Sequence, residues 1–188
     1  MQQPRYHNNH NNTVIQIKLR DNLFTLVQLR PNFFMEFFNI AYTQAGFDQI
    51  NLNNIERIFC IKVASQKFRS LMISRINLEA VTPNLRPLPN RMLSAIIEPG
   101  PRYGAKLIEF DKSFSELNAT IIKENLNIKD DLELIYSYEL SGMYGDPIKL
   151  TKRLLRYFDT RINWDESKEF LFKGIKILPA NYKSILYN

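Results

Sequence analysis

The sequence is poor in the side chains that most often carry out catalysis. It contains one cysteine, Cys60, and two histidines, His7 and His10, among 188 residues. A single cysteine excludes an intrachain disulfide. Because both histidines lie in an Asn-rich leader, the remaining chain cannot supply a Ser-His-Asp or Cys-His site, or a histidine-ligated zinc site. The histidine pair could bind a metal weakly, but the polar composition favours a disordered tail.

Long apolar runs are also missing. No stretch of the chain reaches the roughly 20 apolar residues of a transmembrane helix, and the leader lacks the apolar segment of a secretory signal. Together with the scarcity of cysteine, these absences predict a cytoplasmic protein.

Familiar catalytic and phosphate-binding motifs are absent as well. The turn SGMYGDP carries two glycines before a helix start, but it lacks the Lys-Ser/Thr pair of a P-loop and the third glycine of a dinucleotide fold. Pairs of carboxylates read as solvated groups: Asp130 with Asp131, and Asp165 with Glu166. We therefore expect no enzymatic activity, no cofactor and no metal site.

The composition does provide a core and a charge. Apolar residues make up 45% of the chain, with 13 Phe and 9 Tyr, which is enough for a sizeable hydrophobic core. The net charge of +6 permits contact with nucleic acid, an acidic protein or anionic lipid, without selecting among them.

Alternation of apolar and polar residues predicts most of the strands. Residues 13–19 and 23–29 flank a short charged turn and form a candidate hairpin. The aromatic run FFMEFFNIAY fits either a strand buried on both faces or the start of a helix, and we favour the strand because the run is short. The remaining predicted strands are 58–63, which includes an inert buried Cys60, then 106–110, then the alternating segment 132–140. Two further candidates are MISRINLE at 72–79 and an edge strand within 169–178.

One amphipathic helix is predicted over 147–158. Asp146 suits the N-cap and Pro147 the first helical position. Apolar side chains share one face of this helix, namely Leu150, Leu154, Leu155 and Phe158. Basic side chains share the opposite face, namely Lys149, Lys152, Arg153 and Arg156. This face is either an ordinary solvated surface or a docking surface.

The segment 82–104 is rich in proline, so we expect an irregular loop there. Long Pro-rich loops in compact domains are often functional, although a loop held to the surface is the alternative. The segment carries four candidate anchors: Arg86, Arg91, Arg102 and Tyr103.

These elements predict an α+β fold, with a mainly antiparallel curved sheet and the C-terminal helix packed against it. Residues 1–12 form the disordered polar leader, residues 13–168 a single domain, and residues 169–188 a C-terminal extension that could add an edge strand.

The order of segments resembles the immunity protein 26 family of bacterial polymorphic toxin systems. The stretches IERIFCIKVASQKFRSLMISRINLE and YELSGMYGDPIKLTKRLLRYFDTRINW are similar to that family's central strand with its connection and to its closing strand, turn, helix and tryptophan. The similarity spans roughly residues 13–165. The resemblance implies a cytosolic antitoxin that binds and blocks a cognate toxin domain.

Two functions are therefore predicted. The first is an immunity protein that neutralises a cognate toxin domain by protein–protein binding. The alternative is a small basic nucleic-acid-binding module. In either case we expect the partner to contact the basic helix face and the Pro-rich segment, through Lys149, Lys152, Arg153, Arg156, Arg86, Arg91, Arg102 and Tyr103.

Overall fold

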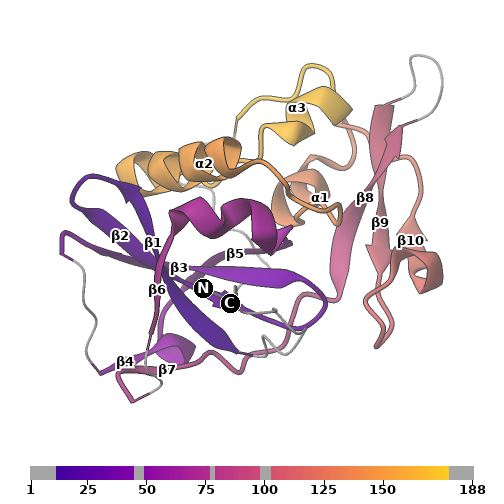
Figure 1. The fold of residues 1–188 in the computed structure, drawn as a ribbon. Coiled ribbons are helices and arrows are strands. Elements are labelled where there is room, and N and C mark those ends of the chain that lie inside the picture. Colours follow the sequence, from indigo (N-terminus) through magenta and orange to yellow (C-terminus); the bar gives the residue numbers. More distant parts are fainter. Residues whose placement is uncertain (1–11, 45–48, 77–78, 98–102, 178–188) are drawn as a thin grey trace.

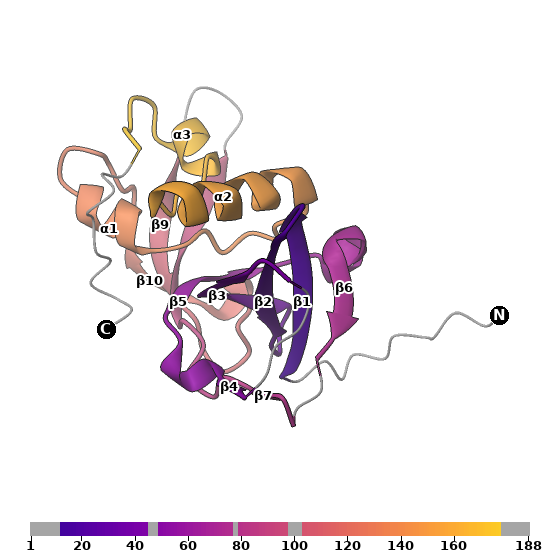
Figure 2. The same ribbon diagram turned by 90° about the vertical axis from the view of Figure 1, so that its left-hand side faces the viewer.

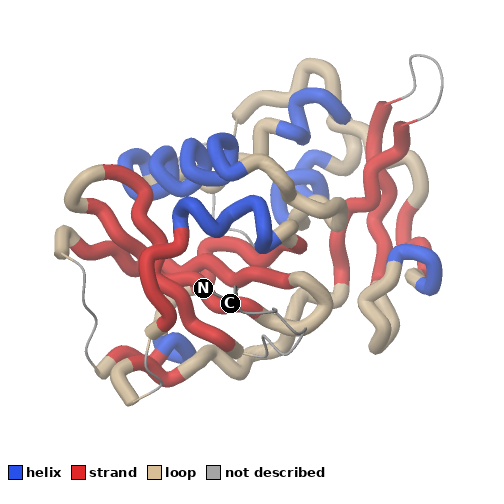
Figure 3. Tube along the Cα trace, in the orientation of Figure 1, coloured by secondary structure: helices blue, strands red, loops and turns tan. Residues whose placement is uncertain are grey.

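The computed structural model describes residues 12–44, 49–76, 79–97 and 103–177. The described residues form two antiparallel sheets, a short parallel pair of strands and a few helices, arranged as in Figures 1 and 3. The predicted α+β class, with a C-terminal helix packed on a sheet, is confirmed. The histidine leader lies outside the described residues.

The larger sheet has five strands in the order β5-β3-β2-β1-β6. Its strands are β1 Thr13–Arg20, β2 Leu23–Leu29, β3 Phe34–Tyr42, β5 Arg57–Lys62 and β6 Met72–Arg75. The predicted hairpin is confirmed as the antiparallel pair of β1 and β2. Asn22 adopts the left-handed conformation at its turn, with φ of 56°.

Strand β3 resolves the choice that the aromatic run left open. Phe37 and Phe38 are both fully buried, and they belong to core clusters on opposite faces of the sheet. The Phe37 ring stacks on Phe59 of β5, with ring centroids 4.4 Å apart. A strand buried on both faces explains why apolar residues occupy positions of both parities.

The predicted helix is α2, Pro147–Thr160, which lies over one face of the larger sheet (Figures 1 and 2). The Asp146 carboxylate accepts hydrogen bonds from the backbone N–H groups of Ile148 and Lys149, at 2.9 and 3.1 Å. Leu150 and Leu154 are buried against this sheet. The N-cap and the apolar face of this helix are therefore confirmed.

A second, three-stranded sheet corrects the prediction that 82–104 is irregular. Its order is β10-β9-β8, with β8 Arg91–Ile97, β9 Tyr103–Glu109 and β10 Thr120–Lys123. Pro87 and Pro89 precede β8, whereas Pro99 and Pro101 fall outside the described residues. The prolines therefore lie outside the described strands and do not break them.

The predicted strand at 132–140 is wrong, because residues Leu132–Ser137 form helix α1. Within α1 and its C-cap, the residues that pack into the core of the second sheet are Leu134, Ile135 and Tyr138. This spacing of one, three and four is helical, and it outweighs the alternation of Leu and Tyr in the sequence. Only Leu140 keeps a strand-like contact, an isolated bridge to Leu93 of β8.

The predicted edge strand within 169–178 is also wrong for the described residues. Residues Ser167–Leu171 form the short helix α3, which contacts β9. Leu171 and Phe172 are both buried in the core of the second sheet. Two adjacent buried residues do not fit a strand with one exposed face.

Small elements complete the described chain: β4 Ile50–Asn51, β7 Val81–Thr82, and the 3₁₀ helices η1 Leu52–Asn54, η2 Ser65–Leu71 and η3 Glu116–Asn118. Among the residues described, no helix is both long and apolar enough to span a membrane.

Candidate functional site

Only some of the basic side chains on α2 are exposed to solvent. Lys149 and Lys152 are exposed, as predicted. Arg153 is buried, with 3% of its surface exposed, and Arg156 is half-buried and paired with Glu166. The predicted continuous positive stripe is therefore wrong at its centre, because the helix is partly covered on that side as well.

Arg153 belongs to a buried charge cluster. Its guanidinium donates to Glu139 Oε1 at 2.6 Å and to Asn163 Oδ1 at 2.8 Å, and it lies 3.6 Å from Asp165. The guanidinium carbon is 4.0 Å from the centre of the Phe59 ring. Burial opposes its charge, but Glu139 and Asp165 outweigh that effect and raise the pKa of Arg153.

This cluster corrects the interpretation of Asp165 as part of a solvated pair. Asp165 and Glu139 are both buried. The protein tolerates their burial because the Arg153 guanidinium pairs with both of them.

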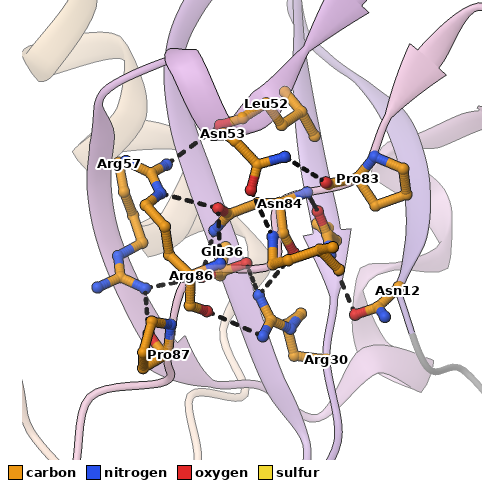
Figure 4. Close-up of polar contacts among 12 residues, drawn as sticks. Asn12, Arg30, Glu36, Leu52, Asn53, Arg57, Pro83, Asn84, Arg86 and Pro87 are labelled. Carbon is orange, nitrogen blue, oxygen red and sulfur yellow. Dashed lines mark hydrogen bonds and ion pairs between the residues drawn. The ribbon is translucent and has the colours of Figure 1, made fainter.

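The Pro-rich segment is held to the larger sheet by a buried carboxylate, Glu36 of β3 (Figure 4). Glu36 accepts from Arg30 at 2.6 Å, from Arg57 at 2.7 Å and from the Asn84 amide at 2.9 Å. Arg30 and Arg57 also donate to backbone carbonyls of the segment, at Asn84, Arg86 and Pro87. The network therefore fixes the path of the chain on its way to β8.

Arg86 has a structural role in the same network. Its guanidinium donates to Asn84 Oδ1 at 2.8 Å and to the carbonyls of Leu52 and Ile55, at 3.2 and 2.7 Å. None of these hydrogen bonds goes to a carboxylate. Burial, followed by repulsion from Arg57, lowers the pKa of Arg86.

Next to this network lies a groove of about 460 Å³. Its walls come from β5, from the segment before β8 and from the end of α1. Three arginines line it, Arg57, Arg86 and Arg91, together with Tyr138 and the prolines at 87 and 89. Hydrogen bonds from Arg91 to Glu109 and to Tyr138 raise the pKa of Arg91. The groove therefore combines positive charge with apolar walls.

A second exposed feature lies at the far end of the three-stranded sheet. Tyr103 is 48% exposed and packs at a tilt against Phe170 of α3, which is 59% exposed, with ring centroids 4.6 Å apart. Ile97 is the cross-strand partner of Tyr103 and is 66% exposed. We call Ile97, Tyr103 and Phe170 the tip patch. Arg102 precedes it in the chain but lies outside the described residues.

The predicted site residues thus divide among separate places. Arg86 and Arg91 line the groove, Tyr103 forms part of the tip patch, and Lys149 and Lys152 lie on α2. The structure does not bring them into one surface, because β8 separates Arg91 at its first residue from Tyr103, which pairs with its last residue.

Groups associated with catalysis are sparse in the part of the chain that the structure describes. There, no three His, Cys, Asp or Glu residues gather as metal ligands. Burial, followed by repulsion from Glu36, raises the pKa of the Cys60 thiol well above its usual value. A buried, protonated thiol is a weak nucleophile, and the predicted burial of Cys60 is confirmed.

Comparison with known families places the chain. Its residues 5–177 match the model of the "Domain of unknown function (DUF8309)". The chain belongs to this family. No curated protein and no solved structure matches the chain. The resemblance to immunity protein 26 stays a prediction, because none of these findings bears on it.

Several residues that line the groove or hold its walls were not among the predicted site residues. One of them, Glu36, could have been identified from the sequence. Glu36 is the single charged residue in the apolar run FFMEFFNIAY, which is typical of a carboxylate that is buried with partners. Arg57 begins β5 and Arg30 follows β2, but no local pattern connects either of them to Glu36. Tyr138 was missed because its segment was interpreted as a strand.

Proposed function

We propose that this chain is a cytoplasmic immunity protein, which binds a cognate bacterial toxin domain and neutralises it without catalysis. The observation that best supports a protein-binding role is the tip patch. Three large apolar side chains, two of them aromatic, meet there with about half or more of their surfaces exposed. Exposed apolar clusters mark protein interaction sites, and tyrosine is among the usual interface anchors.

The toxin as the partner is supported by the resemblance in segment order rather than by the tip patch. Resemblance and patch are compatible, because an immunity protein needs a rigid contact surface and no reactive groups. The tip patch stands on β8, β9 and α3, whose side chains pack into one core cluster. A rigid support of this kind reduces the entropy lost on binding.

Nucleic-acid binding has less support from the surface. On the basic face of α2, Arg153 is buried and Arg156 is paired with Glu166. The exposed cations of that face are therefore Lys149 and Lys152. Binding to nucleic acid would weaken steeply with salt, in proportion to the phosphates neutralised. Binding to a toxin through the tip patch would be less sensitive to salt.

To test this proposal, the toxin domain encoded beside the gene for this chain is expressed in bacteria with and without the chain, and growth is measured. We expect the wild-type chain to restore growth and to bind the purified toxin domain. Tyr103→Ala and Phe170→Ala should each weaken binding by about tenfold or more, mainly through faster dissociation. Ile148→Ala is the matched control, because Ile148 is 69% exposed on α2, away from the tip patch.

Charge steering is tested separately with Lys152→Glu, because Arg153 is buried and unsuitable for a surface test. If the toxin surface is acidic, this reversal slows association and leaves dissociation nearly unchanged. The proposal fails if the neighbouring gene product is not toxic. It also fails if both tip variants neutralise and bind as well as Ile148→Ala does.

A further inference from the structure

The arginine-lined groove is separate from the tip patch, on which the proposed function rests, and it differs from that patch in shape and charge. It is concave, with a volume of about 460 Å³, which falls within the range of small-ligand sites. It lies where the two sheets meet, between β5, the segment before β8 and the end of α1. Its walls are therefore held by the main core.

The charges around the groove do not balance. Three arginines line it, Arg57, Arg86 and Arg91. A fourth, Arg30, pairs with the same carboxylate as Arg57. Against these four stand two carboxylates, Glu36, which pairs with Arg30 and Arg57, and Glu109, which pairs with Arg91. Glu139 also lines the groove, but it and Asp165 face two buried cations, Arg153 and Lys168, so this cluster adds no net charge.

The excess of positive charge is therefore about two. A phosphate monoester carries close to two negative charges at neutral pH, whereas a carboxylate carries one. Guanidinium groups also match the oxygens of a phosphate with paired hydrogen bonds. Burial is the main cause of the lowered pKa of Arg86, and repulsion from Arg57 lowers this pKa further.

The apolar part of the groove adds a second requirement. Pro87, Leu88, Pro89 and Tyr138 supply flat or apolar surface beside the arginines. Inorganic phosphate would leave this surface uncovered, but an organic phosphate with a ring would cover it. A volume of about 460 Å³ accommodates a molecule of this size.

We propose that this groove binds a small phosphate monoester, with Arg57, Arg86 and Arg91 facing the phosphate and Tyr138 with the prolines contacting the organic group. This site does not depend on the toxin partner. It would give the chain a small-molecule ligand in addition to a protein partner.

The test is calorimetric titration of the whole chain with phenyl phosphate and with AMP. We expect both to bind, inorganic phosphate to bind more weakly, and adenosine not to bind detectably. Affinity should fall as salt is raised, because the attraction is largely between charges.

Arg91→Gln is the decisive variant, because the Arg91 side chain is 46% exposed and its loss should leave the fold intact. It removes hydrogen bonds to a charged ligand, so affinity for phenyl phosphate should drop about tenfold or more. Arg91→Lys, which keeps the charge and loses the planar fork, should give an intermediate loss. Arg20→Gln is the matched control, since Arg20 is 52% exposed and also pairs with a carboxylate, Asp159, outside the groove.

Four results would overturn the proposal. These are no binding of either phosphate ester at millimolar concentration, adenosine binding as tightly as AMP, equal affinities for Arg91→Gln and Arg20→Gln, or a tetraglutamate peptide binding more tightly than phenyl phosphate. The last result would point to an acidic protein segment as the occupant. Tyr103→Ala should bind phenyl phosphate normally, which separates this site from the proposed toxin contact.

Discussion

Arg153 lies on the polar side of α2, yet it is enclosed by groups from three other parts of the chain. Its partners Glu139 and Asp165 come from either side of the helix in sequence, and Phe59 comes from β5. A charged side chain becomes buried only where partners of this kind are already present. The Arg153 cluster therefore fixes α2 to its surroundings rather than presenting charge to a partner.

We expect Arg153→Ala to lower the free energy of unfolding by about 3–5 kcal/mol, because Glu139 and Asp165 would be left buried without their cation. Urea unfolding followed by far-UV circular dichroism measures this change. Lys152→Ala, one residue earlier and exposed, should change stability by less than about 0.5 kcal/mol. Equal effects of the two substitutions would show that Arg153 is not buried in solution.

Lys168 of α3 is the second buried cation. Its ammonium group donates to the carbonyl of Ile135 at 2.7 Å, close to the end of α1, and only 3% of the residue is exposed. Burial lowers its pKa to about 8, with Glu139 acting in the opposite direction. The folded state therefore releases this proton at a lower pH than the unfolded chain does.

This difference has a defined sign. Between about pH 8 and the ordinary lysine value of 10.5, the unfolded chain binds more protons, so stability should rise with pH in this window. The rise attributable to Lys168 is roughly 3 kcal/mol at most. Lys168→Met should remove it, whereas Lys149→Met on the exposed face of α2 should not. Urea unfolding at a series of pH values tests this, and parallel pH profiles for wild type and Lys168→Met would contradict it.

At the scale of elements, the Glu36 network connects the Pro-rich segment to the larger sheet. The backbone N–H of Asn84 donates to Gln28 Oε1 of β2 at 2.7 Å, and the backbone N–H of Leu85 donates to Asn53 Oδ1 at 2.8 Å. A segment without helix or strand hydrogen bonds depends on such side-chain partners to satisfy its backbone. Loss of the central carboxylate should therefore loosen the whole segment.

We expect Glu36→Gln to destabilise the protein by about 3–5 kcal/mol, because Arg30 and Arg57 lose their shared carboxylate. Amide hydrogen exchange at Asn84 and Leu85 should also become faster. Glu109→Gln is the control, since Glu109 pairs with Arg91 near the surface. Unchanged exchange at Asn84 in the Glu36 variant would show that the network does not hold the segment.

At the scale of the whole molecule, the two sheets share a core. Met92 of β8 and Ile108 of β9 pack with Phe34 of β3 and Cys60 of β5. The same junction carries the groove on its surface. Because each sheet buries apolar side chains of the other, we expect them to unfold together.

Met92→Ala tests this expectation, since Met92 is fully buried at the junction. It should cost about 2–5 kcal/mol, through lost burial and the cavity left behind. Trp164 fluorescence and far-UV circular dichroism should still report one coincident transition. Met143→Ala, at a residue that is 51% exposed, is the control. Two separate transitions in the wild-type chain would show that the sheets are independent units.

Local patterns in the sequence were sufficient for much of the larger sheet and for its helix. The hairpin of β1 and β2, strand β5 and the capped start of α2 follow from alternation, from Asp146 and from Pro147. Each of these signals acts between residues that are close in the chain. Such signals can be read without knowing the fold.

The second sheet could not be read in the same way. Prolines around 82–104 masked β8 and β9, and alternation of Leu and Tyr imitated a strand where α1 forms. For α1, contact with β8, β9 and α3 decided which residues were buried. Tertiary packing outweighed the local pattern.

Residue patterns along the chain were enough to predict the α+β class and the cap and apolar face of α2. The partner of each buried charge, in contrast, follows from the folded arrangement. Arg153 and Lys152 are adjacent and similar in the sequence, but one is buried and the other exposed. The reason is that burial of a charge depends on carboxylates brought from distant positions, such as Glu139 to Arg153 and Glu36 to Arg57. No local pattern records those distances.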